Sequence, residues 1–214
     1  VRSSQARSPL DVSCPCTTSP SSPGARRKRH EHSCPPERPP PGAASPATRE
    51  YTVAMLEIGG LTPLTTIDFP GRLAAVVFCQ GCPWRCGYCQ NAHLIPPSAE
   101  KAVPWVDVLA FLERRRGLLE GVVFSGGEPT LQAGLPEALR QVRDLGFATG
   151  LHTAGPYPER LAAVLPLLDW VGFDVKAKAQ AYPTLTAGGP ASGERAWESL
   201  RRVLASGVAC EVRT

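Results

Sequence analysis

Long apolar runs and a secretion signal are both missing from this chain of 214 residues. Its longest continuous apolar stretch is Leu73–Cys79, which is far shorter than the roughly 18 apolar residues that suggest a membrane-spanning helix. The N-terminus has no charged segment followed by an apolar one, so the sequence gives no support to secretion. Methionine is also scarce, and the single one is Met55. The sequence therefore excludes a membrane-spanning helix.

The first 54 residues have too few large apolar side chains to build a core. They contain ten prolines and nine serines and no Ile, Phe or Trp. Such a segment cannot bury enough apolar surface to offset its conformational entropy. We therefore expect residues 1–54 to be a disordered, basic, Pro- and Ser-rich tail. Because Met55 stands where the composition becomes globular, we also hypothesise that the natural chain starts there and that the tail is not native.

Positive charge is in excess only within this tail. The chain has 23 Lys and Arg against 19 Asp and Glu, and eight of the basic and four of the acidic residues fall in residues 1–54. Residues 55–214 are therefore neutral overall, and the sequence predicts no nucleic-acid partner for them. The basic run Arg26–His30 is interpreted as a solvated stretch of the tail, with a targeting or polyanion-binding patch as the alternative.

Residues 55–214 alternate between short apolar runs and amphipathic stretches. The runs predict five buried strands, at Leu73–Cys79, Gly121–Ser125, Phe147–Leu151, Trp170–Val175 and Val208–Val212. The stretches between them predict helices, at Val103–Arg116, Leu135–Leu145, Pro158–Leu168 and Glu194–Ala205. Strands that alternate with helices predict right-handed βαβ units, a parallel sheet and an α/β fold.

Chemically distinctive residues follow four of the predicted strands. They are Cys82, Cys86 and Cys89 after the first strand, Gly126-Gly127-Glu128 after the second, His152-Thr153 after the third, and Asp174 and Lys176 at the fourth. In βα folds the carboxyl ends of the strands lie along one edge, where binding and catalytic residues collect. We therefore expect these four segments to converge on one site.

Cys82, Cys86 and Cys89, called the loop cysteines below, have the spacing Cys-x3-Cys-x2-Cys. An iron–sulfur cluster normally takes four thiolates, so three would leave one iron open to another ligand. Structural zinc is the alternative, and it would need Cys79 or His93 as a fourth ligand. We favour iron–sulfur because structural zinc usually joins two separated ligand pairs, and because Cys79 ends a buried strand, where a packed thiol is expected. Clustered thiols without a secretion signal favour a reducing, cytoplasmic compartment.

The loop cysteines and Gly126-Gly127-Glu128-Pro129 together resemble the signature of radical S-adenosylmethionine (SAM) enzymes. Four other segments resemble the activating proteins of anaerobic ribonucleoside-triphosphate reductase, which are glycyl-radical activating enzymes: Gly59–Pro63, Thr66–Gly71, Gln80–Pro83 and Gly172–Lys176. The resemblance covers residues 55–214. It implies a radical SAM domain there, with the parallel strands of a partial (β/α) barrel, a 4Fe-4S cluster and SAM.

The resemblance also implies a role for each site residue. The loop cysteines would bind three irons, and the methionine part of SAM would bind the fourth. The other implied cofactor contacts are Gly126, Gly127 and Glu128 at the methionine ammonium, Tyr88 near the adenine, Thr153 in the lining of the site, and Asp174 and Lys176 near the ribose and carboxylate. Taken alone, Tyr88 could simply pack the loop, and the two glycines could form an ordinary turn.

The implied reaction is the reductive cleavage of SAM, followed by hydrogen abstraction from a glycine of anaerobic ribonucleotide reductase or another glycyl-radical enzyme. A one-electron donor such as flavodoxin or ferredoxin would be needed. Two alternatives stay open: another radical SAM enzyme acting on a small molecule, and a zinc-stabilised binding module. Because the sequence stops at Thr214, inside the fifth predicted strand, we expect a barrel truncated in strand 5 and an open sheet edge.

Overall fold

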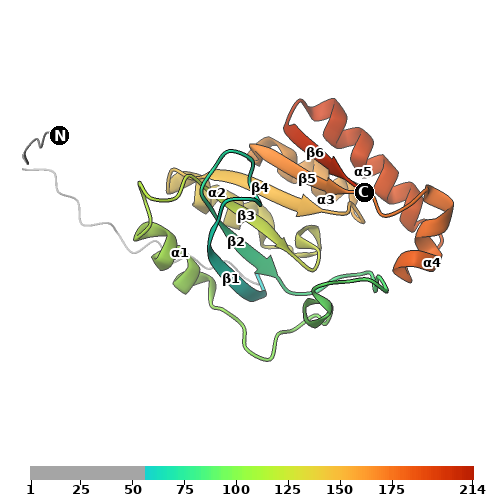
Figure 1. Ribbon diagram of the computed structural model, residues 1–214, viewed down its shortest axis with the longest axis horizontal. Coiled ribbons are helices and arrows are strands. Elements are labelled where there is room, and N and C mark those ends of the chain that lie inside the picture. Colours follow the sequence, from blue (N-terminus) through green and yellow to red (C-terminus); the bar gives the residue numbers. More distant parts are fainter. Residues whose placement is uncertain (1–55) are drawn as a thin grey trace, which may run out of the picture. The chain divides into compact units, whose positions relative to one another are not determined.

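Each apolar run that predicts a strand forms one, and the computed structural model, which describes residues 56–214, adds another strand before them. The six strands lie side by side in chain order, as Figure 1 shows. They are β1 (Ile58–Thr65), β2 (Ala74–Cys79), β3 (Gly121–Gly126), β4 (Ala148–Thr153), β5 (Trp170–Asp174) and β6 (Ala209–Arg213).

The four predicted helices are present with small changes at their ends. The α-helices are α1 (Trp105–Glu113), α2 (Leu135–Asp144), α3 (Pro158–Val164), α4 (Tyr182–Thr186) and α5 (Ser192–Ser206). The sequence did not predict α4. The helix expected to reach Leu168 ends at Val164 and continues as a short 3₁₀ turn, because Pro166 has no amide hydrogen to donate within a helix.

β1 corrects the expectation of a wholly parallel sheet. β2 to β6 run parallel, as predicted, but β1 pairs antiparallel with β2. The sequence of β1 contains two glycines and Pro63, residue types that are depleted in strands, so its apolar pattern is weak. Pro63 is tolerated because β1 is an edge strand whose pairing is irregular between Thr62 and Thr65. The strand expected as the fifth is therefore β6.

The main core lies between one face of the sheet and the helices. Because side chains alternate along a strand, Ala75 and Val77 of β2 share this face with Val122 and Phe124 of β3. Helices α1, α2, α3 and α5 cover the face (Figure 1). The buried helix residues in this core include Val108, Leu109, Leu112, Leu135, Leu139, Val142, Leu161, Val164, Leu200 and Val203.

The opposite face is covered by the loop between β1 and β2. Phe69 of this loop is 3% exposed and stacks on Trp170, with 5.7 Å between ring centroids. The ring lies against Gly121 and Gly150, where a β-carbon would stand 2.9 Å and 3.4 Å from ring atoms. The two glycines thus make room for Phe69, which closes this side of the sheet below the loops at the strand ends.

The predictions for the tail, the basic run and Met55 lie outside the described residues. In residues 56–214, none of the helices combines the length and the apolar character that crossing a membrane requires. β1 and β6 are the two edge strands of the described sheet, and Val212 of β6 is 44% exposed.

Candidate active site

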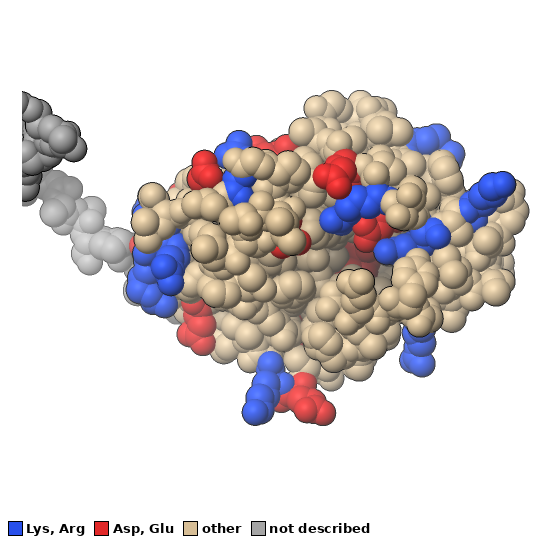
Figure 2. Space-filling view, viewed as in Figure 1, with Lys and Arg blue, Asp and Glu red and all other residues tan. Residues whose placement is uncertain are grey.

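A cavity of about 320 Å³ lies where the parallel strands end. Figure 2 shows a hollow in this face, with basic and acidic side chains around it. The predicted convergence of four segments is confirmed, because each of them contributes to the lining. The lining residues include the loop cysteines, Trp84, Tyr88, Ser125, Gly126, Gly127, Glu128, His152, Thr153, Asp174, Lys176 and Arg213.

Backbone hydrogen bonds hold the loop that carries the loop cysteines. The Gly81 amide donates to the Leu94 carbonyl at 2.8 Å, and the Arg85 amide donates to the Thr186 carbonyl at 2.7 Å. The second bond ties the loop to α4, the helix that the sequence did not predict. Burial raises the pKa of the Cys82 thiol to about 12, so this thiol is protonated near neutral pH unless a metal displaces the proton.

The donor set suits a cluster better than a single metal ion. All three loop cysteines line the same cavity, and all are free thiols. Residues 56–214 contain no group of three or more His, Cys, Asp or Glu side chains that could share one metal ion. In an iron–sulfur cube each thiolate binds a different iron, so the thiols need to surround a common space rather than meet at a point. The three loop cysteines meet the part of this requirement that they share one cavity.

Cys79 and His93, the two possible fourth ligands for zinc, do not line the cavity. Cys79 is fully buried in the main core, as the sequence predicts, and burial raises the pKa of its thiol above the usual range. His93 is exposed on the short 3₁₀ turn Ala92–Leu94. The geometry therefore gives the zinc alternative no fourth ligand from either residue.

Gly126 and Gly127 allow the turn after β3 to touch the start of the cysteine loop. The Gly127 amide donates to the Cys79 carbonyl, and the Glu128 amide donates to the Gly81 carbonyl, each at 2.9 Å. Gly126 has φ of +114°, and a β-carbon on Gly127 would collide with the Gly81 carbonyl oxygen. These glycines are therefore required by the contact between two loops, whatever they do for a ligand.

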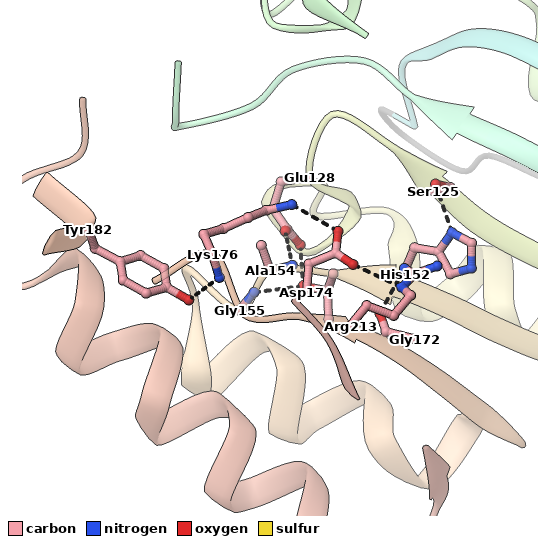
Figure 3. A network of polar contacts seen from close by, with 11 residues as sticks. Ser125, Glu128, His152, Ala154, Gly155, Gly172, Asp174, Lys176, Tyr182 and Arg213 are labelled. Carbon is pink, nitrogen blue, oxygen red and sulfur yellow. Dashed lines mark hydrogen bonds and ion pairs between the residues drawn. The ribbon is translucent and has the colours of Figure 1, made fainter. Parts of the chain in front are cut away.

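Glu128 is buried at the centre of a hydrogen-bond network that the sequence did not reveal. Its Oε1 accepts from the Thr130 amide at 3.1 Å, the Thr130 hydroxyl at 2.5 Å and the Thr153 hydroxyl at 2.8 Å. Its Oε2 accepts from the Ala154 amide at 3.1 Å (Figure 3). Burial raises the pKa of the Glu128 carboxyl, while these donors act in the opposite direction. Thr153 thus acts on the site through Glu128.

Asp174 lies between two cations. Its Oδ2 is 3.0 Å from Lys176 Nζ, and its Oδ1 is 2.9 Å from Arg213 Nε (Figure 3). Lys176 Nζ also lies 5.9 Å from the centroid of the Tyr88 ring, which is 53% exposed. Arg213 was not among the residues predicted from the sequence. The register of β5 and β6, which pairs Arg213 with Asp174, is what brings them together.

His152 lines the floor of the cavity and is held at both ring nitrogens. Nδ1 is 3.2 Å from the Ser125 hydroxyl, and Nε2 is 3.1 Å from the Asp68 carbonyl. A carbonyl can only accept, so Nε2 carries a hydrogen, and in the neutral ring Nδ1 accepts from Ser125. Burial lowers the pKa of His152, and the nearby Arg213 lowers it further. The geometry therefore favours a neutral imidazole of fixed orientation.

One cavity at the carboxyl edge of the parallel sheet is lined by three free thiols, the buried Glu128 carboxylate and the ion pairs of Asp174. This combination is that of an α/β enzyme built around an iron–sulfur centre. The model of the radical SAM superfamily matches residues 76–214, and the chain belongs to this superfamily. The cofactors of the superfamily are a 4Fe-4S cluster and SAM.

Relatives within the superfamily have several activities. MJ1227 of Methanocaldococcus jannaschii, whose name assigns it provisionally to the glycyl-radical enzyme activating enzymes, is 32% identical over an alignment of 133 residues that covers 58% of this chain and 52% of the relative. The pyruvate formate-lyase-activating enzyme of Clostridium pasteurianum is 32% identical over 129 residues, with 58% and 54% covered. The 7-carboxy-7-deazaguanine synthase of Thermococcus kodakarensis is 28% identical over an alignment of 131 residues that covers 50% of this chain and 50% of the relative.

A solved structure supports the fold. Native anSMEcpe with bound AdoMet is 16% identical and gives a TM-score of 0.50, covering 62% of this chain and 40% of that one. At this identity the likeness concerns the fold alone. The chain spans about half the length of the curated relatives named above.

Proposed function

We propose that this protein is a radical SAM activating enzyme that generates a glycyl radical on anaerobic ribonucleoside-triphosphate reductase or another glycyl-radical enzyme. The observation that carries the proposal is the pair of relatives at 32% identity whose names refer to activation of glycyl-radical enzymes. The segments that resemble the reductase-activating proteins support the choice of partner. One of them, Thr66–Gly71, contains Asp68, whose carbonyl lies 3.1 Å from His152 Nε2, and Phe69, which stacks on Trp170.

The loop cysteines would hold the cluster. Their thiols surround one side of the cavity, and Cys82 and Cys86 are partly buried there beside Trp84, which is 5% exposed. Such shielding limits the access of water to a bound cluster. With three protein thiolates, one iron is open to the amino and carboxylate groups of SAM.

Glu128 would receive the methionine ammonium of SAM. Its Oε2 accepts one hydrogen bond, from Ala154, whereas Oε1 accepts three, so Oε2 has acceptor capacity left. Four donors fix the carboxylate before SAM arrives, which reduces the cost of ordering it on binding. Gly126 and Gly127 would bring the adjoining backbone close to the same group, and Thr153 would keep Glu128 in position.

The ion pairs of Asp174 would form the other end of the SAM site. Asp174 would accept hydrogen bonds from the ribose, and Lys176 would face the SAM carboxylate. Tyr88, half exposed on the rim of the cavity, would lie near the adenine. When bound, the cluster and SAM supply a carbon radical that can take a hydrogen atom from a glycine Cα. The chain's own residues orient SAM and limit the access of water.

The electron donor and the compartment are part of the same proposal. Cluster reduction needs a one-electron donor, for which flavodoxin or ferredoxin is suitable. The five cysteines of residues 56–214 are free, as expected for an anaerobic enzyme of the reducing cytoplasm.

A small-molecule substrate is the second candidate. The observation that favours it is the relative named 7-carboxy-7-deazaguanine synthase, whose identity of 28% is close to that of the activating enzymes. The motifs of the cavity concern the cofactors and are compatible with either substrate.

Anaerobic reconstitution of the full-length protein with iron and sulfide tests the proposal. The expected results are the visible absorbance of an iron–sulfur cluster, reductive cleavage of SAM, and a glycyl radical signal in electron paramagnetic resonance when a purified reductase is added. The matched control is the same protein with Cys82→Ala. Cleavage of SAM without a radical on any glycyl-radical partner would favour the second candidate, and a protein that binds no iron would refute both.

A further inference from the structure

A second pocket, of about 220 Å³, lies on the other side of Trp84 from the candidate active site. Its wall is built from three separate segments of the chain. They are Pro83 and Trp84 of the cysteine loop, Pro156 and Tyr157 after β4, and Gly188–Ser192 with Arg195 at the start of α5. Trp84 lines both cavities, so the two sites share one wall.

Polar groups of this pocket lack partners within residues 56–214. Ser192 is 5% exposed, and its buried hydroxyl has no hydrogen-bond partner. Trp84 is also 5% exposed, and its indole nitrogen, which lies beside Gly188, makes no hydrogen bond. A buried polar group without a partner costs about 1–3 kcal/mol, so the Ser192 hydroxyl points to a ligand that accepts hydrogen bonds, and the Trp84 indole is a second donor on the same pocket wall.

The electrostatics of the pocket favour an anion. It lies at the N-terminus of α5, a helix of 15 residues whose dipole attracts negative charge. Arg195 stands at the rim without a carboxylate partner among the described residues. Glu159, Glu194 and Glu198 line a neighbouring groove of about 600 Å³, which Arg195 also lines, and none of these three carboxylates lines the pocket itself.

We propose that this pocket binds a phosphate-type oxyanion, held by the Ser192 hydroxyl, the Trp84 indole and the Arg195 guanidinium beside the N-terminus of α5. Gly189 has open space where a side chain would stand, so the backbone there can come close to such a ligand. The pocket has room for more than one phosphate group, so the ligand is either free phosphate or the phosphate of a small ester. This inference does not depend on the proposed function.

A ligand bound in the pocket would contact the cysteine loop through Trp84. Cys82 and Cys86 pack against the hydrophobic cluster that contains Trp84, and the Trp84 ring packs edge-on against Tyr182, with 5.6 Å between centroids. An anion bound to the indole nitrogen would therefore contact the residue that shields the loop cysteines. Binding is measurable without any cluster, because every donor that holds the anion belongs to the chain.

Isothermal titration calorimetry of the full-length protein without cluster or SAM tests the site. The probes are inorganic phosphate and glycerol 3-phosphate, which separate a free anion from an ester and avoid the base of a nucleotide. We expect one of them to bind with a stoichiometry of one. Arg195→Gln should weaken binding at least tenfold, and Ser192→Ala should weaken it several-fold.

The matched control is Arg201→Gln, on the same helix. Arg201 is exposed, pairs with Glu198 and does not line the pocket, so its loss should leave binding unchanged. Arg195 is exposed as well, so Arg195→Gln is expected to fold even if Ser192→Ala does not. Equal weakening by Arg195→Gln and Arg201→Gln would refute the site, as would heats no larger than those of dilution with both probes.

Discussion

Replacing Glu128 by Gln is the sharpest test of the proposed SAM site. Alanine would leave the three donor groups of Thr130 and Thr153 and the Ala154 amide without their acceptor, so it would disturb the fold as well as the ligand. Glutamine keeps the shape of the side chain. Its oxygen must occupy the Oε1 position, since three donors point there, and its NH₂ group then replaces Oε2.

The expected loss follows from this orientation. At the Oε2 position the NH₂ group faces the Ala154 amide and the proposed SAM ammonium, and it can accept from neither. A hydrogen bond to a charged group contributes about 1.5–3 kcal/mol, so SAM affinity should fall about tenfold or more. The lost bond from Ala154 should lower the free energy of unfolding by about 1–3 kcal/mol. The cluster spectrum should persist, because the loop cysteines are unchanged.

Equilibrium dialysis of SAM against the anaerobically reconstituted protein measures the effect. The control is Glu120→Gln, which removes the same charge just before β3, where Glu120 accepts from the Leu73 amide at 2.9 Å. Glu120 does not line the cavity, so SAM affinity should be unchanged in this variant. Unchanged affinity in Glu128→Gln, or an equal loss in both variants, would refute the assigned role of Glu128.

Three further predictions concern the loop, the turn and the floor of the cavity. Alanine at any loop cysteine should abolish the visible absorbance of the reconstituted cluster, whereas the Cys79→Ala variant should retain this absorbance. Loss of all iron in Cys79→Ala would overturn the assignment of three cysteine ligands. Gly127→Ala should lower the free energy of unfolding, measured in urea titrations, by about 1–3 kcal/mol, because the added β-carbon meets the Gly81 carbonyl. Gly87→Ala is the control and should have little effect, because a β-carbon at Gly87 meets no atom within 4 Å. Because the pKa of His152 is lowered in the folded state, the unfolded chain binds the extra proton first, so stability should fall as the pH drops through about 6.5. His152→Gln should reduce this fall, and an identical pH dependence in both proteins would contradict the buried, neutral ring.

Local patterns determined the parts of this protein that the sequence predicted correctly. The runs at β2, β3 and β5 are apolar because both faces of the sheet are covered there, so they stand out from their surroundings. The order of strands and helices then places the strand ends, and the residues that follow them, along one edge. The loop cysteines all lie within eight residues, so their spacing by itself indicates a cluster loop.

Tertiary structure alone decided how distant residues meet. The pairing of Arg213 with Asp174 depends on the register of β5 and β6, and the bonds from Thr153 to Glu128 join the ends of two strands. β1 was missed because it is held by pairing with β2 and not by its own apolar pattern. The pocket between Trp84 and Ser192 exists because α5 packs beside the cysteine loop. Propensity and periodicity act over a few neighbouring residues, whereas these contacts join positions that only the folded chain brings together.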